Sequence, residues 1–217
     1  MAPPATPVRA LLFDFDGVLA DTEPLHWRAW REIVQPFGID LDWVTFRDTC
    51  IGVTDSAMLH KLCALADKPV TPDELRAHYP QKRKLFHDLV DGRSLIPPDL
   101  IEILKSLTQF RLGVVTSSNR AEIESILQKE QLLQVLGTVV YGNDVRHHKP
   151  DPEPYLLAME RLGVAACDTI VFEDSAAGMQ SARAAGCHAV QVHNVAQVAA
   201  LVRAQVGENF GWQHHSL

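Results

Sequence analysis

Several features that would point to a particular class of protein are scarce or missing in this sequence of 217 residues. It has four cysteines, far apart and without a Cys-x-x-Cys pair, so neither a disulfide framework nor a zinc site is predicted. No apolar run is long enough to cross a membrane, and the start lacks the basic segment and apolar stretch of a secretory signal. We therefore expect a cytoplasmic protein with reduced thiols and no membrane partner.

Clusters of basic residues are also missing. The 20 Lys and Arg residues are scattered among 27 Asp and Glu residues, and the formal net charge is −7. Because a nucleic-acid interface needs grouped cations, no nucleic-acid partner is expected. The hydrophobic share of 47% suffices for a sizeable core, in one domain or in a domain with an insertion. We expect a monomer or a small homo-oligomer.

Five short apolar segments rich in β-branched residues have the pattern of buried strands in a parallel sheet. They span residues 8–14, 111–117, 138–141, 169–173 and 188–192. Stretches with apolar residues at helical spacing separate most of them, and Gly163 and Gly186 follow two of these stretches as candidate helix ends. The alternation predicts an α/β fold with a doubly wound parallel sheet.

The interval after the first strand is far longer than one crossover helix requires, at roughly 75 residues. Apolar residues recur at helical spacing in three parts of it, at 27–37, 58–65 and 75–89. We expect a small all-α insert over residues 21–90, with residues 1–20 and 91–217 forming the α/β core.

Polar groups stand where four strand patterns stop. Asp14 and Asp16 follow the first, Thr116 and its neighbours the second, and Glu173 with Asp174 the fourth. The carboxyl ends of parallel strands share one edge of a sheet, where ligands of open α/β sheets collect. Lys149 follows the third strand by a short loop, so all four groups are expected to converge on one crevice.

These residue types suit a phosphate bound with a divalent cation. Asp14, Glu173 and Asp174 offer the hard oxygen ligands that Mg²⁺ takes together with phosphate oxygens and water. We assign three further residues to phosphate binding, through a cation and hydroxyl groups: Lys149, Thr116 and Ser117.

The first two acids have different expected roles. No serine, cysteine or histidine is placed to replace Asp14, which is therefore the expected nucleophile that attacks phosphorus to give an aspartyl-phosphate. Asp16, two residues on, is the expected general acid and base for the leaving group and for water. Gly17 permits the backbone turn that directs both carboxylates inward.

Four ordered motifs resemble those of the haloacid dehalogenase superfamily, in its β-phosphoglucomutase and phosphoglycolate phosphatase branch. They are Asp-Phe-Asp-Gly-Val-Leu-Ala-Asp-Thr-Glu at 14–23, Thr-Ser-Ser at 116–118, His-Lys-Pro-Asp-Pro at 148–152 and Val-Phe-Glu-Asp-Ser-Ala-Ala-Gly at 171–178. The resemblance implies a Rossmann-like core, a helical cap that closes over the substrate, and Mg²⁺ as cofactor. It also implies that Asp16 lends its backbone carbonyl to the metal, beside Asp14, Glu173 and Asp174.

His26 resembles a histidine that related phosphomutases keep near the acid/base aspartate, so we include it as a candidate substrate-binding residue. A hydrogen-bonded or exposed helix histidine is the alternative interpretation. The expected function is an Mg²⁺-dependent phosphatase acting on a small phosphorylated metabolite, a sugar phosphate or a phosphoglycolate-like compound.

A sugar phosphomutase is the main alternative. Family mutases carry a Lys-Gly-x-x-Arg pattern in the cap, whereas here Ile51 precedes Gly52 and Asp55 stands near the arginine position. Arg47, Lys61 or Arg120 remains as a possible cation for a second phosphate.

A receiver-like signalling domain, or another non-enzymatic phosphate-binding protein, is an alternative of a different class. The long insert and the Asp-x-Asp pair on the first strand argue against it. Dehalogenase chemistry is disfavoured by Lys149 and Thr116, and no motif marks a cap lysine for phosphonatase chemistry.

Overall fold

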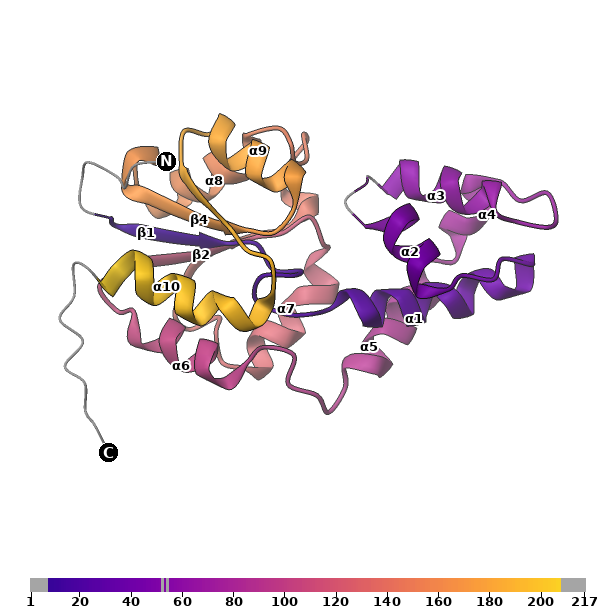
Figure 1. Cartoon of the computed structure of the whole chain (residues 1–217), viewed down its shortest axis with the longest axis horizontal. Coiled ribbons are helices and arrows are strands. Elements are labelled where there is room, and N and C mark those ends of the chain that lie inside the picture. The colour runs from indigo at the N-terminus through magenta and orange to yellow at the C-terminus, as the bar shows by residue number, and fades with distance from the viewer. Residues whose placement is uncertain (1–7, 52, 54, 208–217) are drawn as a thin grey trace. The chain divides into compact units, whose positions relative to one another are not determined.

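The computed structural model describes residues 8–51, 53 and 55–207 (Figure 1). The chain divides into two compact units. Met1–Asp21 and Ile96–Leu217 make up the first, which we call the core unit, and Thr22–Leu95 make up the second, the helical unit. The expected second boundary lay at residue 90, where the last helix of the insert ends, but the coil at 91–95 also belongs to the helical unit.

The core unit contains a parallel sheet of five strands in the order β3-β2-β1-β4-β5. The strands are β1 (Ala10–Phe13), β2 (Arg111–Val115), β3 (Leu136–Val140), β4 (Thr169–Glu173) and β5 (His188–Gln191). Each falls within or overlaps a segment expected from the sequence. The order places β1 at the centre, with β2 and β4 on either side, as a doubly wound sheet requires.

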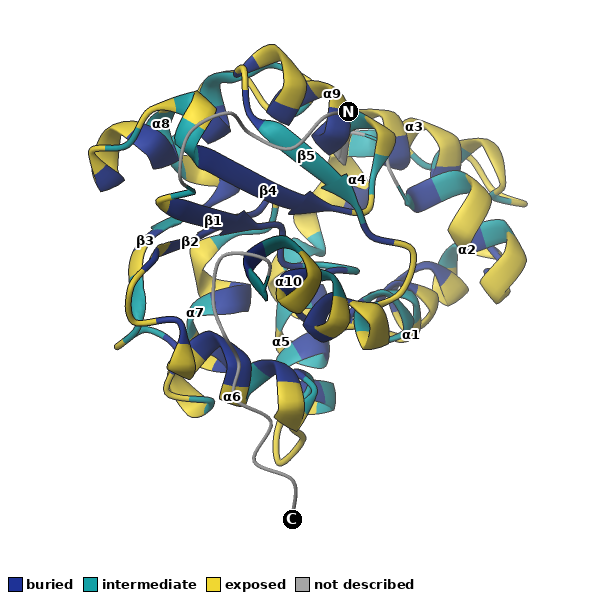
Figure 2. Cartoon of the chain, turned by 60° about the vertical axis from the view of Figure 1, so that its left-hand side comes forward, coloured by how far each residue is buried: buried dark blue, intermediate teal, exposed yellow. Residues whose placement is uncertain are grey.

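Burial increases toward the middle of the sheet. Every residue of β1 and β4 is buried, whereas those of the edge strand β5 are half-buried (Figure 2). Phe13 of β1 and Phe172 of β4 stack on each other with ring centroids 5.0 Å apart. Apolar packing thus holds the ends of β1 and β4 in place, so the polar residues that follow lie at a rigid edge of the sheet.

Helices cover both faces of this sheet (Figure 1). They are α6 (Pro98–Ser106), α7 (Arg120–Lys129), α8 (Glu153–Leu162), α9 (Ala176–Ala184) and α10 (Val198–Gly207). α8 and α9 lie on one face, and α6, α7 and α10 on the other. The α/β, doubly wound fold class is confirmed. Gly163 caps α8 with φ of 62°, the left-handed conformation that favours glycine.

α10 is a helix that the sequence analysis did not predict. Its buried residues include Val198, Val202 and Val206, which recur every four positions. That spacing is a usable signal for a helix face, so the segment was within reach of the pattern analysis.

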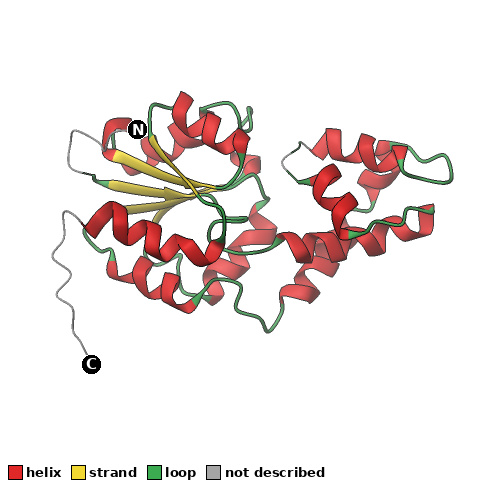
Figure 3. Cartoon of the chain, in the orientation of Figure 1, coloured by secondary structure: helices red, strands yellow, loops and turns green. Residues whose placement is uncertain are grey.

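The helical unit contains helices and loops, and all five strands belong to the core unit (Figure 3). Its helices are α1 (Glu23–Val34), the 3₁₀ helix η1 (Gln35–Phe37), α2 (Trp43–Cys50), α3 (Asp55–Ala64), α4 (Pro72–Ala77) and α5 (Tyr79–Val90). The expected helix at 75–89 is in fact two, which meet at His78. Pro80 suits only the first turn of a helix because it lacks an N–H group.

α2 was also missed from the sequence, although its N-terminus has a recognisable cap. The Asp42 side chain accepts a hydrogen bond from the Thr45 N–H group at 2.7 Å.

No helix in the described part of the chain is both long and apolar enough to span a bilayer.

The helical unit has a hydrophobic core of its own. Buried members include Trp30, Leu41, Phe46, Leu59, Leu62 and Leu75. These residues come from α1 to α4 and from the loop before α2, so the unit is held by contacts between helices rather than by any one of them.

We expect Leu62→Ala to destabilise the helical unit by about 2–5 kcal/mol, because it leaves a cavity at a fully buried side chain. Leu65→Ala, three residues on at a side chain that is 42% exposed, is the matched control. Urea unfolding followed by tryptophan fluorescence measures both, since Trp27, Trp30 and Trp43 belong to this unit. Equal losses in the two variants would contradict the assignment of Leu62 to the core.

Candidate active site

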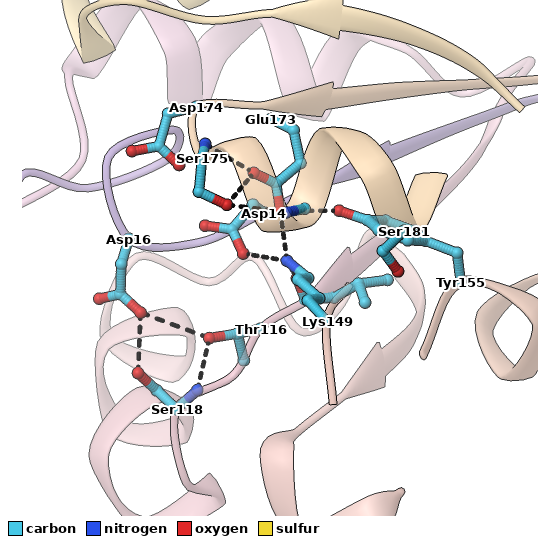
Figure 4. Close-up of polar contacts among 12 residues, drawn as sticks. Asp14, Asp16, Thr116, Ser118, Lys149, Tyr155, Glu173, Asp174, Ser175 and Ser181 are labelled. Atoms are coloured by element: carbon cyan, nitrogen blue, oxygen red, sulfur yellow. Dashed lines mark hydrogen bonds and ion pairs between the residues drawn. The ribbon is translucent and has the colours of Figure 1, made fainter. Parts of the chain in front are cut away.

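The site residues lie where neighbouring strands end together. Phe13, the last residue of β1, is in register with Val114 and with Phe172. The next residue, Asp14, donates its N–H group to the Phe172 carbonyl at 3.0 Å, and Thr116 donates to the Val140 carbonyl at 2.9 Å. Parallel pairing therefore continues by one residue past the named strands. It delivers Asp14 and Thr116 to the same edge of the sheet (Figure 4).

Lys149 connects the acids of this edge. Its ammonium donates to Asp14 Oδ1 at 2.5 Å, to Glu173 Oε1 at 2.5 Å and to the Val115 carbonyl at 2.9 Å. Exposed fractions of the side chains are 6% for Lys149, 10% for Asp14 and 0% for Glu173. Breaking such a buried pair on one side leaves an uncompensated charge, so the three groups hold one another in place.

Burial and charge shift the protonation of this cluster. Burial would lower the pKa of Lys149, but the Asp14 and Glu173 carboxylates outweigh it and raise that pKa to about 12. Burial raises the pKa of Asp14 well above its usual value, and the carboxylates around it add to this, while Lys149 acts in the opposite direction. Lys149 therefore stays a cation, and the carboxyl groups that act on it outnumber this one cation.

Glu173 is enclosed by protein donors on both oxygens. Oε1 accepts from Lys149 and also from the Tyr155 hydroxyl at 3.0 Å. Oε2 accepts from the N–H group of Ser175 at 3.0 Å and from its hydroxyl at 3.1 Å. A Cβ atom at Gly178, in the first turn of α9, would overlap this carboxylate. Glu173, at the end of β4, thus joins the predicted cluster. Its four hydrogen bonds come from Lys149 in the loop before α8, from Tyr155 of α8 and from Ser175, the N-cap of α9 (Figure 4).

Asp174 lies next to the turn that follows β1. Gly17 in that turn has φ of 80°, and a Cβ atom there would overlap the Asp174 carboxylate. Glycine is required at this place by both its conformation and its contact. Desolvation by the surrounding protein is the main cause that raises the pKa of Asp174 to about 6, and the charge of Glu173 adds to it.

Asp16 has different partners from Asp14. Its Oδ2 atom accepts from the Ser118 hydroxyl at 2.8 Å and from the Thr116 hydroxyl at 3.4 Å. Thr116 Oγ1 in turn accepts from the Ser118 N–H group at 3.0 Å. The Asp16 side chain is thus held by hydroxyl groups that follow β2, while Asp14 is held by a cation.

Not every predicted residue belongs to this network. Ser117 is exposed, and the hydrogen bonds described above do not include it. The sequence analysis did not assign Ser118, although it follows β2 in the same polar run, nor Tyr155, which lies within an apolar helix pattern. The run at 116–119 was the available signal for Ser118. The sequence carried no such signal for Tyr155, because its hydroxyl reaches Glu173 from inside the hydrophobic core.

His26 lies on α1 in the helical unit. Its ring stacks on that of Phe86 with centroids 4.2 Å apart, and its Nδ1 atom lies 2.8 Å from the buried Lys82 ammonium. An ammonium only donates, so Nδ1 is the acceptor in this contact.

The donors at the strand ends fit a hard divalent cation. Asp14 and Asp174 supply carboxylate oxygens, and Asp16 can add its backbone carbonyl. Burial raises the pKa of both carboxyl groups, and a bound cation would oppose that shift.

A second group of possible ligand atoms has a structural explanation. Among the described residues, those of His147, Asp151 and Glu153 all lie within 4.8 Å of one another. Glu153 accepts from the N–H groups of Arg146 and His147, both at 2.9 Å, and Asp151 accepts from the Glu153 N–H group at 2.9 Å. These contacts shape the loop that carries Lys149 into α8.

The sequence and fold have relatives of known kind. The model of the haloacid dehalogenase-like hydrolase family matches residues 11–192. The fructose-1-phosphate phosphatase YqaB of Escherichia coli is 34% identical over 84% of this chain and 95% of its own length. A phosphorylated carbohydrates phosphatase of Thermotoga maritima is 32% identical, over 91% of each chain.

A solved structure, a β-phosphoglucomutase from Clostridium difficile, shares the fold. The TM-score is 0.76 at 21% identity, and the match covers 93% of this chain and 98% of the other.

We expect Gly178→Ala to destabilise the core unit by about 1–3 kcal/mol, because its methyl group would displace the Glu173 carboxylate. Gly207→Ala is the control, since a Cβ atom there meets nothing within 4 Å. Thermal unfolding of both variants measures the difference. A Gly178→Ala protein as stable as the control would show that the first turn of α9 yields without cost.

Proposed function

The chain belongs to the family of haloacid dehalogenase-like hydrolases, and we propose that it is an Mg²⁺-dependent phosphatase that releases phosphate from a small phosphorylated sugar through an aspartyl-phosphate. Its similarity to phosphatases of this family makes it a phosphoric monoester hydrolase. The observation that carries the finer proposal is the pairing of Lys149 with Asp14, a cation beside the expected nucleophile at the end of a buried strand.

Asp14 begins the proposed reaction. Its carboxylate attacks phosphorus, the bond between phosphorus and the sugar oxygen breaks, and Lys149 stabilises charge on the phosphoryl oxygens. Thr116, at the end of β2, would add a hydroxyl group on the phosphate side. Bound Mg²⁺, held by Asp14, Asp174 and the Asp16 carbonyl, would neutralise phosphate charge.

Asp16 carries the proposed proton transfers. It protonates the departing sugar oxygen, and then takes a proton from the water that attacks the aspartyl-phosphate, which frees phosphate and restores Asp14. The hydroxyl groups of Ser118 and Thr116 support this role because they orient the Asp16 side chain. Glu173 belongs to the proposed metal and phosphate machinery through Lys149, which it holds.

The phosphatase is favoured over the mutase because two of the candidate cations have other partners. Arg120 contacts Glu124 at 3.0 Å and lies over the ring of Tyr141, 4.4 Å from its centroid. Arg47 pairs with Asp48 at 2.7 Å. Gly52 lies outside the described residues. A receiver-like role is disfavoured because it would leave the hydroxyl-held Asp16 without a task.

A sugar phosphate is the favoured substrate class. The relatives named above act, by their names, on fructose 1-phosphate and on phosphorylated carbohydrates. In the helical unit we propose that His26, held by Lys82, binds the substrate through its Nε2 atom.

We expect the wild-type protein to release phosphate from at least one member of a panel of sugar phosphates and phosphoglycolate, and to need Mg²⁺ for it. Asp14→Asn should lower this activity on the order of 10³-fold or more, because an amide is no nucleophile toward phosphorus. Asp99→Asn, at an exposed acid on α6, should keep full activity. Full activity in Asp14→Asn, or an inactive wild type on the whole panel, would contradict the mechanism.

We expect Asp16→Ala to slow turnover by about 10²–10⁴-fold, the usual contribution of general acid/base catalysis. Its Mg²⁺ affinity should stay near that of the wild type, because the backbone carbonyl remains. Asp174→Ala, which removes a proposed carboxylate ligand, is the comparison, and calorimetric titration with Mg²⁺ measures both. A loss of affinity in Asp16→Ala as severe as that in Asp174→Ala would contradict the division of roles.

A further inference from the structure

Tyr155 stands behind the cluster of Asp14, Lys149 and Glu173. It is fully buried on α8, and its hydroxyl donates to Glu173 Oε1 at 3.0 Å. The Lys149 ammonium lies 5.2 Å from the centroid of its ring. One side chain thus contacts both partners of the ion pair, through its polar end and through its face.

We propose that Tyr155 is a positioning residue, which keeps the Lys149 ammonium directed at Asp14 by sharing the charge of Glu173 Oε1. That oxygen accepts from two donors, the Lys149 ammonium and the Tyr155 hydroxyl. With the hydroxyl present, part of the carboxylate charge is taken up by Tyr155. Without it, the whole charge of Oε1 acts on Lys149, which is drawn from Asp14 toward Glu173.

The hydroxyl is suited to this task because it remains a donor. Burial, and then the charge of Glu173, raise the pKa of Tyr155 well above its usual value, so the group does not ionise beside the carboxylate. A hydrogen bond between neighbouring segments also helps to hold α8, which carries Tyr155, in place. Ser181 of α9 donates to the Asp151 carbonyl at 2.6 Å, which ties α9 to the loop just before α8.

Tyr155 does not touch the reacting atoms, and the inference rests on the proposed function for the meaning of Lys149. A positioning role differs from a packing role in that the effect of the Tyr155 hydroxyl depends on the charge of Glu173. If Tyr155 acts through the charge of Glu173, its hydroxyl should lose its influence once that charge is removed, as in Glu173→Gln. A tyrosine that only fills space would have the same influence in both backgrounds.

The test is a double-mutant cycle of Tyr155→Phe and Glu173→Gln, since Phe keeps the ring and removes only the hydroxyl. The first readout is the Kd of inorganic phosphate with Mg²⁺ present, measured by calorimetric titration, which needs no turnover. The second is kcat/KM for the best substrate of the panel. Thr169→Val is the matched control, since it removes another buried hydroxyl of the core unit, bonded to the Ala165 carbonyl at 2.8 Å.

We expect Tyr155→Phe to raise the phosphate Kd and to lower kcat/KM, each by about tenfold, a change of ~1.4 kcal/mol. In the Glu173→Gln background the same substitution should change both by less than about twofold. Thr169→Val should leave both unchanged, with a loss of thermal stability similar to that of Tyr155→Phe.

Equal effects in the two backgrounds, or an unchanged Kd in Tyr155→Phe, would overturn the inference. A Tyr155→Phe protein far less stable than Thr169→Val, with unchanged Kd, would make Tyr155 a packing residue. If the wild type binds phosphate and the variants show the expected coupling in phosphate Kd, but the wild type hydrolyses nothing on the panel, the proposed function is refuted and the positioning role stands. A wild type that binds no phosphate would overturn both.

Discussion

The ion pairs of Lys149 with Asp14 and Glu173 are the interaction on which the site depends. They join the end of β1, the end of β4 and the loop that leads into α8, three segments far apart in the sequence. Buried charges of this kind are tolerated only when each has its partner. The sheet register and the close approach of Gly178 to Glu173 are therefore conditions for the pairing rather than separate features.

The two aspartates of the first motif are held by different kinds of group. Asp14 is fixed by a cation that follows β3, and Asp16 by hydroxyl groups that follow β2. Lys149 opposes the rise in pKa that burial causes at Asp14, and so favours the ionised form that the proposed nucleophile needs. The hydroxyl groups of Ser118 and Thr116 orient the Asp16 side chain. Because β1 lies between β2 and β4, the hydroxyl groups that follow β2 and the Glu173 carboxylate that holds Lys149 lie on either side of its end.

Much of this arrangement could be predicted from the sequence because it follows from periodicity and strand ends. The apolar run before Asp14 and the position of Thr116 after another such run suffice to place both residues at one edge. Tyr155 could not be found in this way, because a buried tyrosine in an apolar helix pattern looks like packing. The hydrogen bonds of Glu173 with Lys149 and Tyr155 were also hidden, since both partners are far from it in the sequence and no local pattern encodes these contacts. The break at His78 was missed although Pro80 marked it.

The three hydrogen bonds of Lys149 have a consequence for how a ligand enters. An ammonium has three N–H groups, and here they go to Asp14, Glu173 and the Val115 carbonyl, so the cation is already saturated. A phosphate oxygen that approaches it must share or replace one of these acceptors. The Val115 carbonyl makes the longest of the three hydrogen bonds and is the only uncharged acceptor among them. Under the proposed function, the main chain at the end of β2 occupies the place of a ligand atom, and phosphate binding would exchange one acceptor of Lys149 for another.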